Sequence, residues 1–169
     1  MSALERVQAA LEGVPARIED GLDGSVAVRA AREDAHAVLE RLRDAAGFET
    51  ATFVTAIDRA PEPERFEVCY QLLSVAHADR VRVSVRVGQE DARVPSCTDL
   101  WPGAAYMERE CFDMFGVVFE GHEGLKRLLM PEEYPHHPLR KEFPHQGIEP
   151  DALYRAWERS RKAEEEAQA

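Results

Sequence analysis

Residues 66–87, FEVCYQLLSVAHADRVRVSVRV, contain two runs in which apolar and more polar side chains alternate. Apolar residues occupy every second position from 66 to 72, and valine occupies every second position from 81 to 87. A period of two is typical of strands with one buried face, so the short polar link between the runs predicts an antiparallel hairpin. We expect the arginines of this hairpin to cover its solvent-facing side and to discourage edge pairing.

The sequence before this hairpin alternates between helical and extended patterns. Leu4, Val7 and Leu11 have helical spacing, and a second apolar stripe runs over residues 35–46 and ends before Gly47, a typical C-terminal cap. Residues 25–29 and 52–57 favour strands, and the prolines at 61 and 63 exclude a continuing central strand. This order predicts a two-layer α+β fold in which helices pack on a small mixed sheet, followed by an extended docking segment and a terminal helix.

The overall charge excludes two classes of partner. The chain has 169 residues, of which 21 are Lys or Arg and 32 are Asp or Glu, giving a net charge of −11. Nonspecific binding to nucleic acid or to anionic lipid needs a clustered positive field, which this balance disfavours. No apolar run approaches the roughly 20 residues of a membrane-spanning helix, and Glu5 and Arg6 argue against a secretion signal. Membrane association is therefore expected only through another protein.

Charged residues gather in a predicted helix between residues 98 and 116. Thr98 or Asp99 is expected to cap its start, and Gly116 to end it. Arg109 and Asp113 are four residues apart and can pair along the helix, or a charged side chain of this region can reach inward or across to a partner.

The chain after this helix is rich in proline. Residues 117–119 suit a strand edge and residues 121–124 a loop, whereas prolines at 131, 135, 138 and 144 exclude continuous helix. Residues 134–143 must therefore be largely extended. A partner surface is the more economical support for such a segment, and the chain's own surface is the alternative.

The sequence contains no self-contained catalytic motif. Four histidines lie between residues 122 and 145, but neither an HExxH motif nor a Cys/His knuckle is present. Nucleophile elbows and glycine-rich phosphate loops are also absent. Cys69, Cys97 and Cys111 are too few for a four-cysteine iron–sulfur cluster, and their separation favours small buried side chains in a reducing cytoplasm.

Three stretches of the sequence resemble one known family. The run ERECFDMFGVVFEGH (108–122), LKRLL (125–129) and HPLRKEFP (137–144) resemble the C-type subunit, also called the 30 kDa type, of proton-pumping NADH:quinone oxidoreductase (respiratory complex I). Residues 66–72, and Pro95 with residues 98–101, fit the earlier part of that family, so the resemblance spans most of residues 30–144. Residues 123–124 and His136 depart from the family pattern, which affects the expected shape of the local loops.

The resemblance implies a peripheral-arm subunit on the cytoplasmic side of the cell membrane. Such a subunit packs against the quinone-pocket (D-type) subunit and near the iron–sulfur (B-type) subunit. The FMN, the iron–sulfur clusters and the quinone lie on partner subunits, and the implied chain has no catalytic, cofactor-binding or metal-binding residue. Related subunits occur in membrane-bound nickel–iron hydrogenases and photosynthetic quinone reductases, so a complex with another electron donor is an alternative. A stand-alone metal-dependent hydrolase using residues 136–145, or an unrelated cytosolic scaffold, are further alternatives.

These inferences divide the chain into three parts with different expected roles. Residues 1–97 form the α+β core module, residues 98–144 the partner-docking segment, and residues 145–169 a charged helical tail that begins near Pro150 and is pinned by Leu153 and Trp157. Arg140→Ala is expected to leave the isolated chain folded and to weaken its association with the quinone-pocket subunit. The residues predicted to form the partner interface are Trp101, Glu108, Arg109, Glu110, Asp113, Phe115, His122, Arg127, Tyr134, His137, Leu139, Arg140, Lys141 and Phe143.

Overall fold

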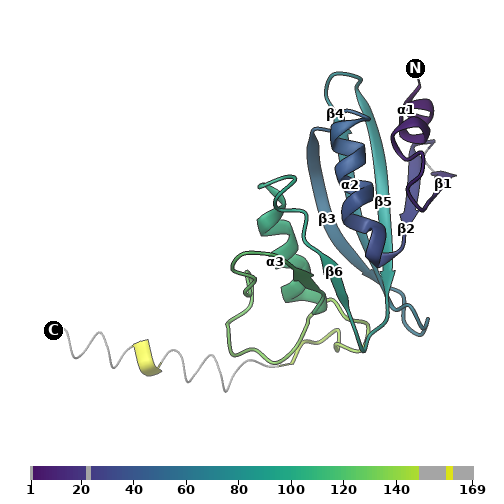
Figure 1. Cartoon of the computed structure of the whole chain (residues 1–169). Helices are drawn as coiled ribbons and strands as arrows, with labels where there is room; N and C mark the ends of the chain where they lie inside the picture. Colours follow the sequence, from purple (N-terminus) through teal and green to yellow (C-terminus); the bar gives the residue numbers. More distant parts are fainter. Residues whose placement is uncertain (1, 22–23, 149–158, 162–169) are drawn as a thin grey trace.

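The computed structural model describes residues 2–21, 24–148 and 159–161 (Figure 1). The expected tail helix at Pro150, Leu153 and Trp157 lies outside these residues. In chain order the elements are α1 (Ala3–Ala10), β1 (Ala16–Asp20), β2 (Val26–Ala30), the 3-10 helix η1 (Arg32–Asp34), α2 (Ala35–Asp44), β3 (Thr50–Asp58), β4 (Phe66–Ser74), β5 (Asp79–Val87), β6 (Arg93–Pro95), α3 (Ala104–Phe115) and β7 (Val118–Glu120).

The strands form one large sheet and one small one. The large sheet has the order β1-β2-β5-β4-β3, with β2 and β5 parallel and all other neighbours antiparallel. The small sheet pairs β6 with β7 in parallel. The predicted α+β fold with a mixed sheet is thus confirmed.

The hairpin of β4 and β5 forms the centre of the large sheet. Its register places Val68 opposite Val85 and Tyr70 opposite Val83, and all four side chains are buried on one face. Arg82 points to the other face and is exposed. The predicted hairpin is confirmed, because alternation leaves only one register that buries every second side chain.

Local signals define both N-terminal helices. Ser2 and Glu5 form a reciprocal capping box at the start of α1, in which the Ser2 hydroxyl accepts from the Glu5 N–H and Glu5 accepts from the Ser2 N–H. After α2, Gly47 adopts a left-handed φ of 73°, and the Phe48 N–H returns to the Leu42 carbonyl at 3.0 Å. This arrangement is the glycine-terminated helix end predicted at Gly47.

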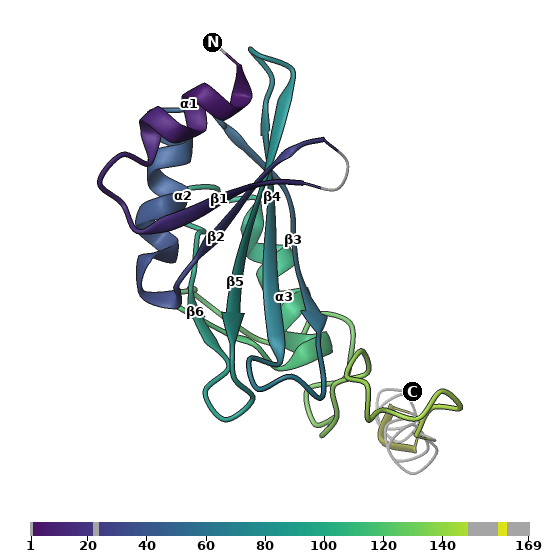
Figure 2. The same ribbon diagram turned by 90° about the vertical axis from the view of Figure 1, so that its right-hand side faces the viewer.

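The helices cover one face of the large sheet, and the opposite face carries no helix of the described residues (Figure 2). Buried side chains from α1, α2 and α3 belong to a single core cluster with the inward-facing side chains of the strands. This cluster contains Val68 and Val85 as well as Cys111 and Phe119. The core is therefore continuous across residue 97, where the sequence suggested a division into two parts.

Two elements differ from the sequence expectation. Strand β1 was not expected, because its sequence ARIED contains a single large aliphatic residue. Helix α3 begins at Ala104 with Gly103 as its N-cap, and not at Thr98 or Asp99. The N–H groups of Leu100 and Trp101 form a tight turn onto the Cys97 carbonyl, and Pro102 has no N–H with which to continue a helical ladder. The predicted helix end at Gly116 and the strand before residue 121 are confirmed.

Candidate docking site

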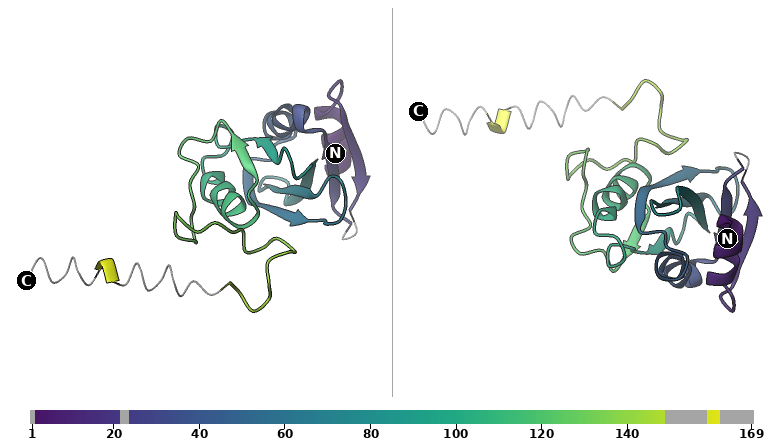
Figure 3. Two further views of the ribbon diagram at one scale, coloured as in Figure 1. Left: turned by 90° about the horizontal axis from the view of Figure 1, so that it is seen from below. Right: turned by 90° about the horizontal axis from the view of Figure 1, so that it is seen from above.

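The candidate site is built from α3 and from residues 125–148, which we call the strap. Figure 3 shows that the strap runs beside α3, away from β1. The strap has no strand or helix of its own. Its position must therefore come from contacts with other parts of the chain.

Glu108 fixes the first half of α3 to the segment that follows β6. Its side chain is fully buried; Oε1 accepts from the Cys97 N–H at 2.7 Å and Oε2 accepts from the Ser96 hydroxyl at 2.7 Å. Glu108 therefore reaches inward, one of the two orientations that the sequence left open. This differs from the expectation of a partner contact, because no side-chain surface of Glu108 remains for one. Glu110, two residues away on the helix, is exposed.

Asp113 organises the start of the strap. The carboxylate is fully buried, accepts from Arg127 Nη1 at 2.6 Å, and also accepts from three consecutive main-chain N–H groups, those of Leu128, Leu129 and Met130, at 2.7–3.0 Å. Burial alone raises the pKa of Asp113, but these donors outweigh it and the pKa lies below its ordinary value. The side chain of Arg109, its expected partner on the helix, forms no ion pair with it.

The Arg109 side chain binds main-chain carbonyl groups of the same loop. Its Nε donates to the Lys126 carbonyl at 3.2 Å and its Nη2 to the Arg127 carbonyl at 2.9 Å. A helical pairing of Arg109 with Asp113 is therefore wrong: Arg127 supplies the cation for Asp113, and Arg109 supplies donors to the loop carbonyls. His122 acts similarly at the other end of α3, where Nε2 donates to the Ala105 carbonyl at 3.1 Å.

The strap satisfies the carbonyl groups that a helix leaves free at its C-terminal end. The Asp113 carbonyl accepts from His137 Nδ1 at 2.9 Å, the Met114 carbonyl from the Leu139 N–H at 3.1 Å, and the Phe115 carbonyl from Arg140 Nε at 2.7 Å. The Phe112 carbonyl accepts from the Gly116 N–H. All four terminal carbonyls thus have donors, and the positive charges of Arg127 and Arg140 lie at the favourable end of the helix dipole.

A second anchor joins the strap to the turn between β3 and β4. Asp58 accepts two hydrogen bonds from Arg65, at 2.8 and 2.6 Å, and one from the Lys141 N–H at 2.8 Å. The hydrogen bonds from Arg65 hold the pKa of Asp58 well below its usual range despite burial. Arg65 also pairs with Glu142 of the strap. Sequence reasoning missed Asp58, Arg65 and Glu142, since no local pattern links residues so far apart in the chain.

Several predicted interface residues thus have their partners within the chain. Arg140 and Lys141 were expected to meet acceptors on a neighbour, but they donate to the carbonyls of Phe115 and Ala60. The expected aromatic anchors Trp101 and Tyr134 are 6% and 4% exposed. Of the two supports that the sequence left open, this chain itself holds residues 137–142. The expectation of largely extended chain over residues 134–143 is wrong for residues 138–143, which form turns with the Arg140 N–H bonded to the His137 carbonyl and the Phe143 N–H to the Arg140 carbonyl.

The strap exposes large apolar side chains among charged ones such as Lys126 and Lys141. Leu129 is 63% and Leu139 53% exposed, and Tyr106 on the adjacent surface of α3 is 66% exposed. The His136 ring lies between Tyr134 and Phe143, with ring centroids 5.5 and 6.3 Å away. These side chains are held on an ordered backbone without being covered by it.

The described residues contain little reactive chemistry. Within residues 2–21, 24–148 and 159–161, no group of three or more His, Cys, Asp or Glu side chains is placed to hold a metal ion. Burial raises the pKa of the Cys69 thiol to about 11, and it raises the pKa values of Cys97 and Cys111 further. These thiols therefore remain protonated at neutral pH and are poor nucleophiles. Among the helices of the described residues, none has the length and apolar character needed to cross a membrane.

Comparison with known proteins places this arrangement in a family. Residues 28–149 match the model of the respiratory-chain NADH dehydrogenase 30 kDa subunit. The chain belongs to this family. The matched region contains the large sheet from the middle of β2 onward, α3 and the whole strap.

Individual relatives agree with this assignment. The C-type NADH-quinone oxidoreductase subunit of a Roseiflexus species (strain RS-1) is 42% identical over 144 residues, covering 85% of this chain and 83% of the relative. The chain covers 77% of the corresponding subunit from Citrifermentans bemidjiense, at 41% identity, but only 57% of that from Saccharopolyspora erythraea. The solved structure of a trypsin-resistant fragment of Nqo5 is 37% identical, with a TM-score of 0.65 over 72% of this chain and 98% of the fragment.

Proposed function

We propose that this chain is a cofactor-free subunit of the peripheral arm of a proton-translocating NADH:quinone oxidoreductase. In the whole complex, electrons pass from NADH to quinone through FMN and iron–sulfur clusters that other subunits carry. This chain contributes a shaped surface on the cytoplasmic side of the membrane, beside the quinone-pocket subunit and the iron–sulfur subunit of B type. It has no catalytic residue of its own.

The observation that carries this proposal is the way in which the strap is held. Main-chain and charged contacts fix its backbone to α3 and to the β3–β4 turn, while Leu129 and Leu139 remain exposed. A preorganised apolar surface loses little conformational entropy when it is covered, which favours stable association over transient contact. This is the behaviour expected of an assembly subunit.

One relative supports the quinone-pocket (D-type) subunit as the neighbour. A protein of Aquifex aeolicus, whose name combines the C and D subunits of NADH-quinone oxidoreductase, is 50% identical over 95 residues, and this chain covers only 16% of its length. Joining the two subunits in one polypeptide favours a position side by side in that complex. We therefore expect the exposed side of the strap to face the quinone-pocket subunit.

A complex with a different electron donor is the second candidate. A chain in the structure of an archaeal membrane-bound sulfane sulfur reductase has a TM-score of 0.73, covers 84% of this chain and is 28% identical. The NADH-quinone oxidoreductase relatives have higher identity, at 41–42% over most of the chain. We therefore favour NADH as the electron donor.

Substitution on the strap tests the proposal. Leu139→Asp places a charge at a half-exposed apolar position while the Leu139 N–H can keep its bond to the Met114 carbonyl. Val75→Asp is the matched control, because Val75 is 67% exposed at the distant β4–β5 turn. We expect Leu139→Asp to reduce co-purification with the quinone-pocket subunit about tenfold or more, the loss typical of a disrupted apolar anchor, and Val75→Asp to leave it unchanged. Equal recovery of both variants would argue against the proposal.

A further inference from the structure

The open face of the large sheet has an apolar half and a basic half. On the edge strand β3, Phe53 is 54% and Ile57 39% exposed, and their cross-strand partners Gln71 and Glu67 lie on the same face. Strand register places a row of arginines on the other half of this face, from β5 across β2 to β1: Arg80, Arg82, Arg86, Arg29 and Arg17.

Acidic side chains on this face neutralise only part of the row. Glu19 pairs with both Arg17 and Arg29, at 2.8 and 3.1 Å, and Arg86 pairs with Glu62 at 2.6 Å and with Glu67 at 3.4 Å. Arg82 is exposed and has no ion pair within the part of the chain described by the structure. An excess of positive charge on one face is notable in a chain whose net charge is −11.

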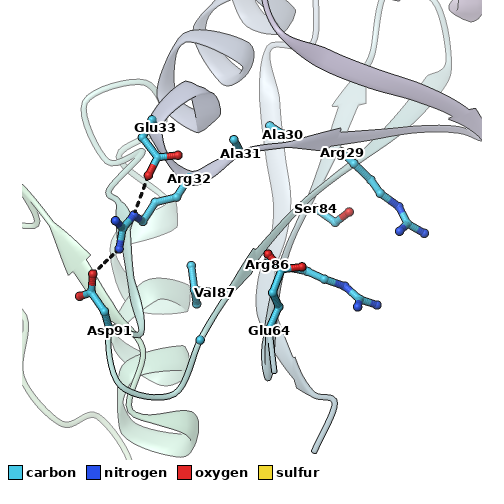
Figure 4. A pocket seen from close by; sticks show the side chains of 11 residues that line it. Arg29, Ala30, Ala31, Arg32, Glu33, Glu64, Ser84, Arg86, Val87 and Asp91 are labelled. Carbon is cyan, nitrogen blue, oxygen red and sulfur yellow. Dashed lines mark hydrogen bonds and ion pairs between the residues drawn. The ribbon is translucent and has the colours of Figure 1, made fainter. Parts of the chain in front are cut away.

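The basic half is also hollowed at one end. A recess of about 450 Å³ lies where the parallel strands β2 and β5 end, and its lining includes Arg29, Ser84 and Arg86. The acidic residues Glu33, Glu64 and Asp91 also line it, so the recess as a whole is close to neutral. Figure 4 shows the guanidinium groups of Arg29 and Arg86 pointing to the same side of this recess. Arg29 already pairs with Glu19 and Arg86 with Glu62, so an entering carboxylate would meet only the N–H donors that these ion pairs leave free.

We propose that the open sheet face binds a second protein surface of the same assembly, one that presents acidic side chains to Arg82 and apolar side chains to Phe53 and Ile57. The inference rests on the proposed function for membership of the assembly, but it concerns a face distinct from the strap. A face that pairs a basic row with an apolar strip specifies both the charge and the orientation of its partner.

Charge and geometry disfavour other occupants. The net charge of −11 opposes binding to nucleic acid and to anionic membranes, and the backbone of a nucleic acid offers no apolar surface to Phe53 and Ile57. A second copy of this chain, packed by two-fold symmetry, would set the arginine row against either the other row or the apolar strip. Both arrangements leave Arg82 without a counter-charge.

Site-specific photo-crosslinking in the intact complex tests this inference. A photoreactive benzoylphenylalanine replaces Phe53 in the full chain, and mass spectrometry identifies the attached peptide. The same replacement at Val75 is the positional control. Arg82→Glu is then compared with Arg41→Glu, a charge reversal at an exposed position of α2. The melting temperature of each isolated variant establishes that it folds.

We expect position 53 to attach to one other subunit, at a peptide containing acidic and apolar residues. Arg82→Glu should lower the yield about tenfold through like-charge repulsion, and Arg41→Glu should not. Attachment to lipid, nucleic acid or another copy of this chain would overturn the inference, as would a yield insensitive to Arg82→Glu. A parallel probe replacing Leu139 separates the two proposals: labelling at 139 but not at 53 overturns this inference alone, whereas no labelling at either position counts against the proposed function as well.

Discussion

The Nε atom of Arg140 donates to the main-chain carbonyl of Phe115, the last residue of α3, at a distance of 2.7 Å. The guanidinium of Arg140 also lies 5.1 Å from the centre of the Phe66 ring, at the start of β4. One strap residue therefore contacts both the end of α3 and the central hairpin of β4 and β5. The docking surface and the core are parts of a single structure, and damage to one is expected to affect the other.

Gly116 is expected to tolerate no side chain. A Cβ atom there would lie 2.4 Å from Arg140 Nη2 and 2.7 Å from His137 Nε2, and its φ is +77°. Gly13 has a φ of +78° and open space around it. Gly13→Ala should therefore lower the free energy of unfolding by about 1–2 kcal/mol through backbone strain alone. Gly116→Ala should lower it by about 1–3 kcal/mol more through overpacking. Urea denaturation measures both, and equal losses would contradict the tight packing.

Asp113→Asn should release the start of the strap. The substitution removes the charge that holds Arg127 and replaces one acceptor oxygen with a donor facing main-chain N–H groups. Truncating one member of a buried pair typically costs about 3–5 kcal/mol, so we expect a loss of that order. Limited proteolysis should then cleave within residues 125–130 faster than in the parent chain. Glu110→Gln, an exposed change on the same helix, is the control and should alter neither result.

Arg65 is predicted to matter far more than a surface arginine. Arg65→Ala leaves the nearly buried Asp58 carboxylate without its cation, and the free energy of unfolding should fall by about 3–5 kcal/mol. Arg17→Ala removes an ion pair whose arginine side chain is 79% exposed, and it should cost less than about 1 kcal/mol. Chemical denaturation of the two variants side by side gives the comparison. Similar losses would mean that the Asp58 anchor does not hold the strap.

Much of the fold could be predicted from sequence because its signals are local. Alternation in residues 66–87 fixed the hairpin and its buried face, and helical spacing with Gly47 and Gly116 fixed two helix ends. The parallel pairing of β2 with β5 could not be predicted, since nothing local distinguishes it from other pairings. Strand β1 could not be predicted because its sequence has only one large aliphatic residue, and it is pairing with β2 that places Ala16 and Ile18 against the core.

The site was less accessible to sequence reasoning than the fold. The stretches between residues 108 and 144 that resemble the family contain the candidate docking site. Their sequence does not show which charged side chains face inward. Arg109 and Asp113 have the spacing of a helical pair, yet a loop fourteen to seventeen residues away supplies the donors to Asp113. Tertiary contacts are stronger than an exposed pair on a helix, which contributes only about 0.3–0.5 kcal/mol. The anchor of Asp58 with Lys141 spans 83 residues and has no sequence signal.

His137 should make the stability of the isolated chain depend on pH. Burial lowers the pKa of His137, and the nearby Arg140 and Arg127 also lower it, although the hydrogen bond to the Asp113 carbonyl opposes this. The folded chain therefore takes up a proton less readily than the unfolded chain, in which a histidine pKa is about 6.5. The stabilisation is present above about pH 6.5 and is lost as the pH falls through the lower folded-state value.

His137→Asn tests this dependence, because an asparagine amide can donate from nearly the same place as Nδ1. The free energy of unfolding of the parent chain should drop more than that of the variant between pH 7.5 and 5. His145→Asn, at an exposed position, is the control and should follow the parent chain. Parallel pH profiles for the parent and His137→Asn would show that His137 does not contribute.

Lysine crosslinking of the intact complex is the most direct test of whether the strap docks on neighbouring subunits. The chain has only three lysines, Lys126, Lys141 and Lys162, and the first two are exposed on the strap. An amine-reactive crosslinker therefore reports almost entirely on the proposed docking surface. We expect Lys126 and Lys141 to become linked to the quinone-pocket subunit or to the neighbouring iron–sulfur subunit. Their absence from every intersubunit link, in a complex that retains this chain and is otherwise well crosslinked, would contradict it.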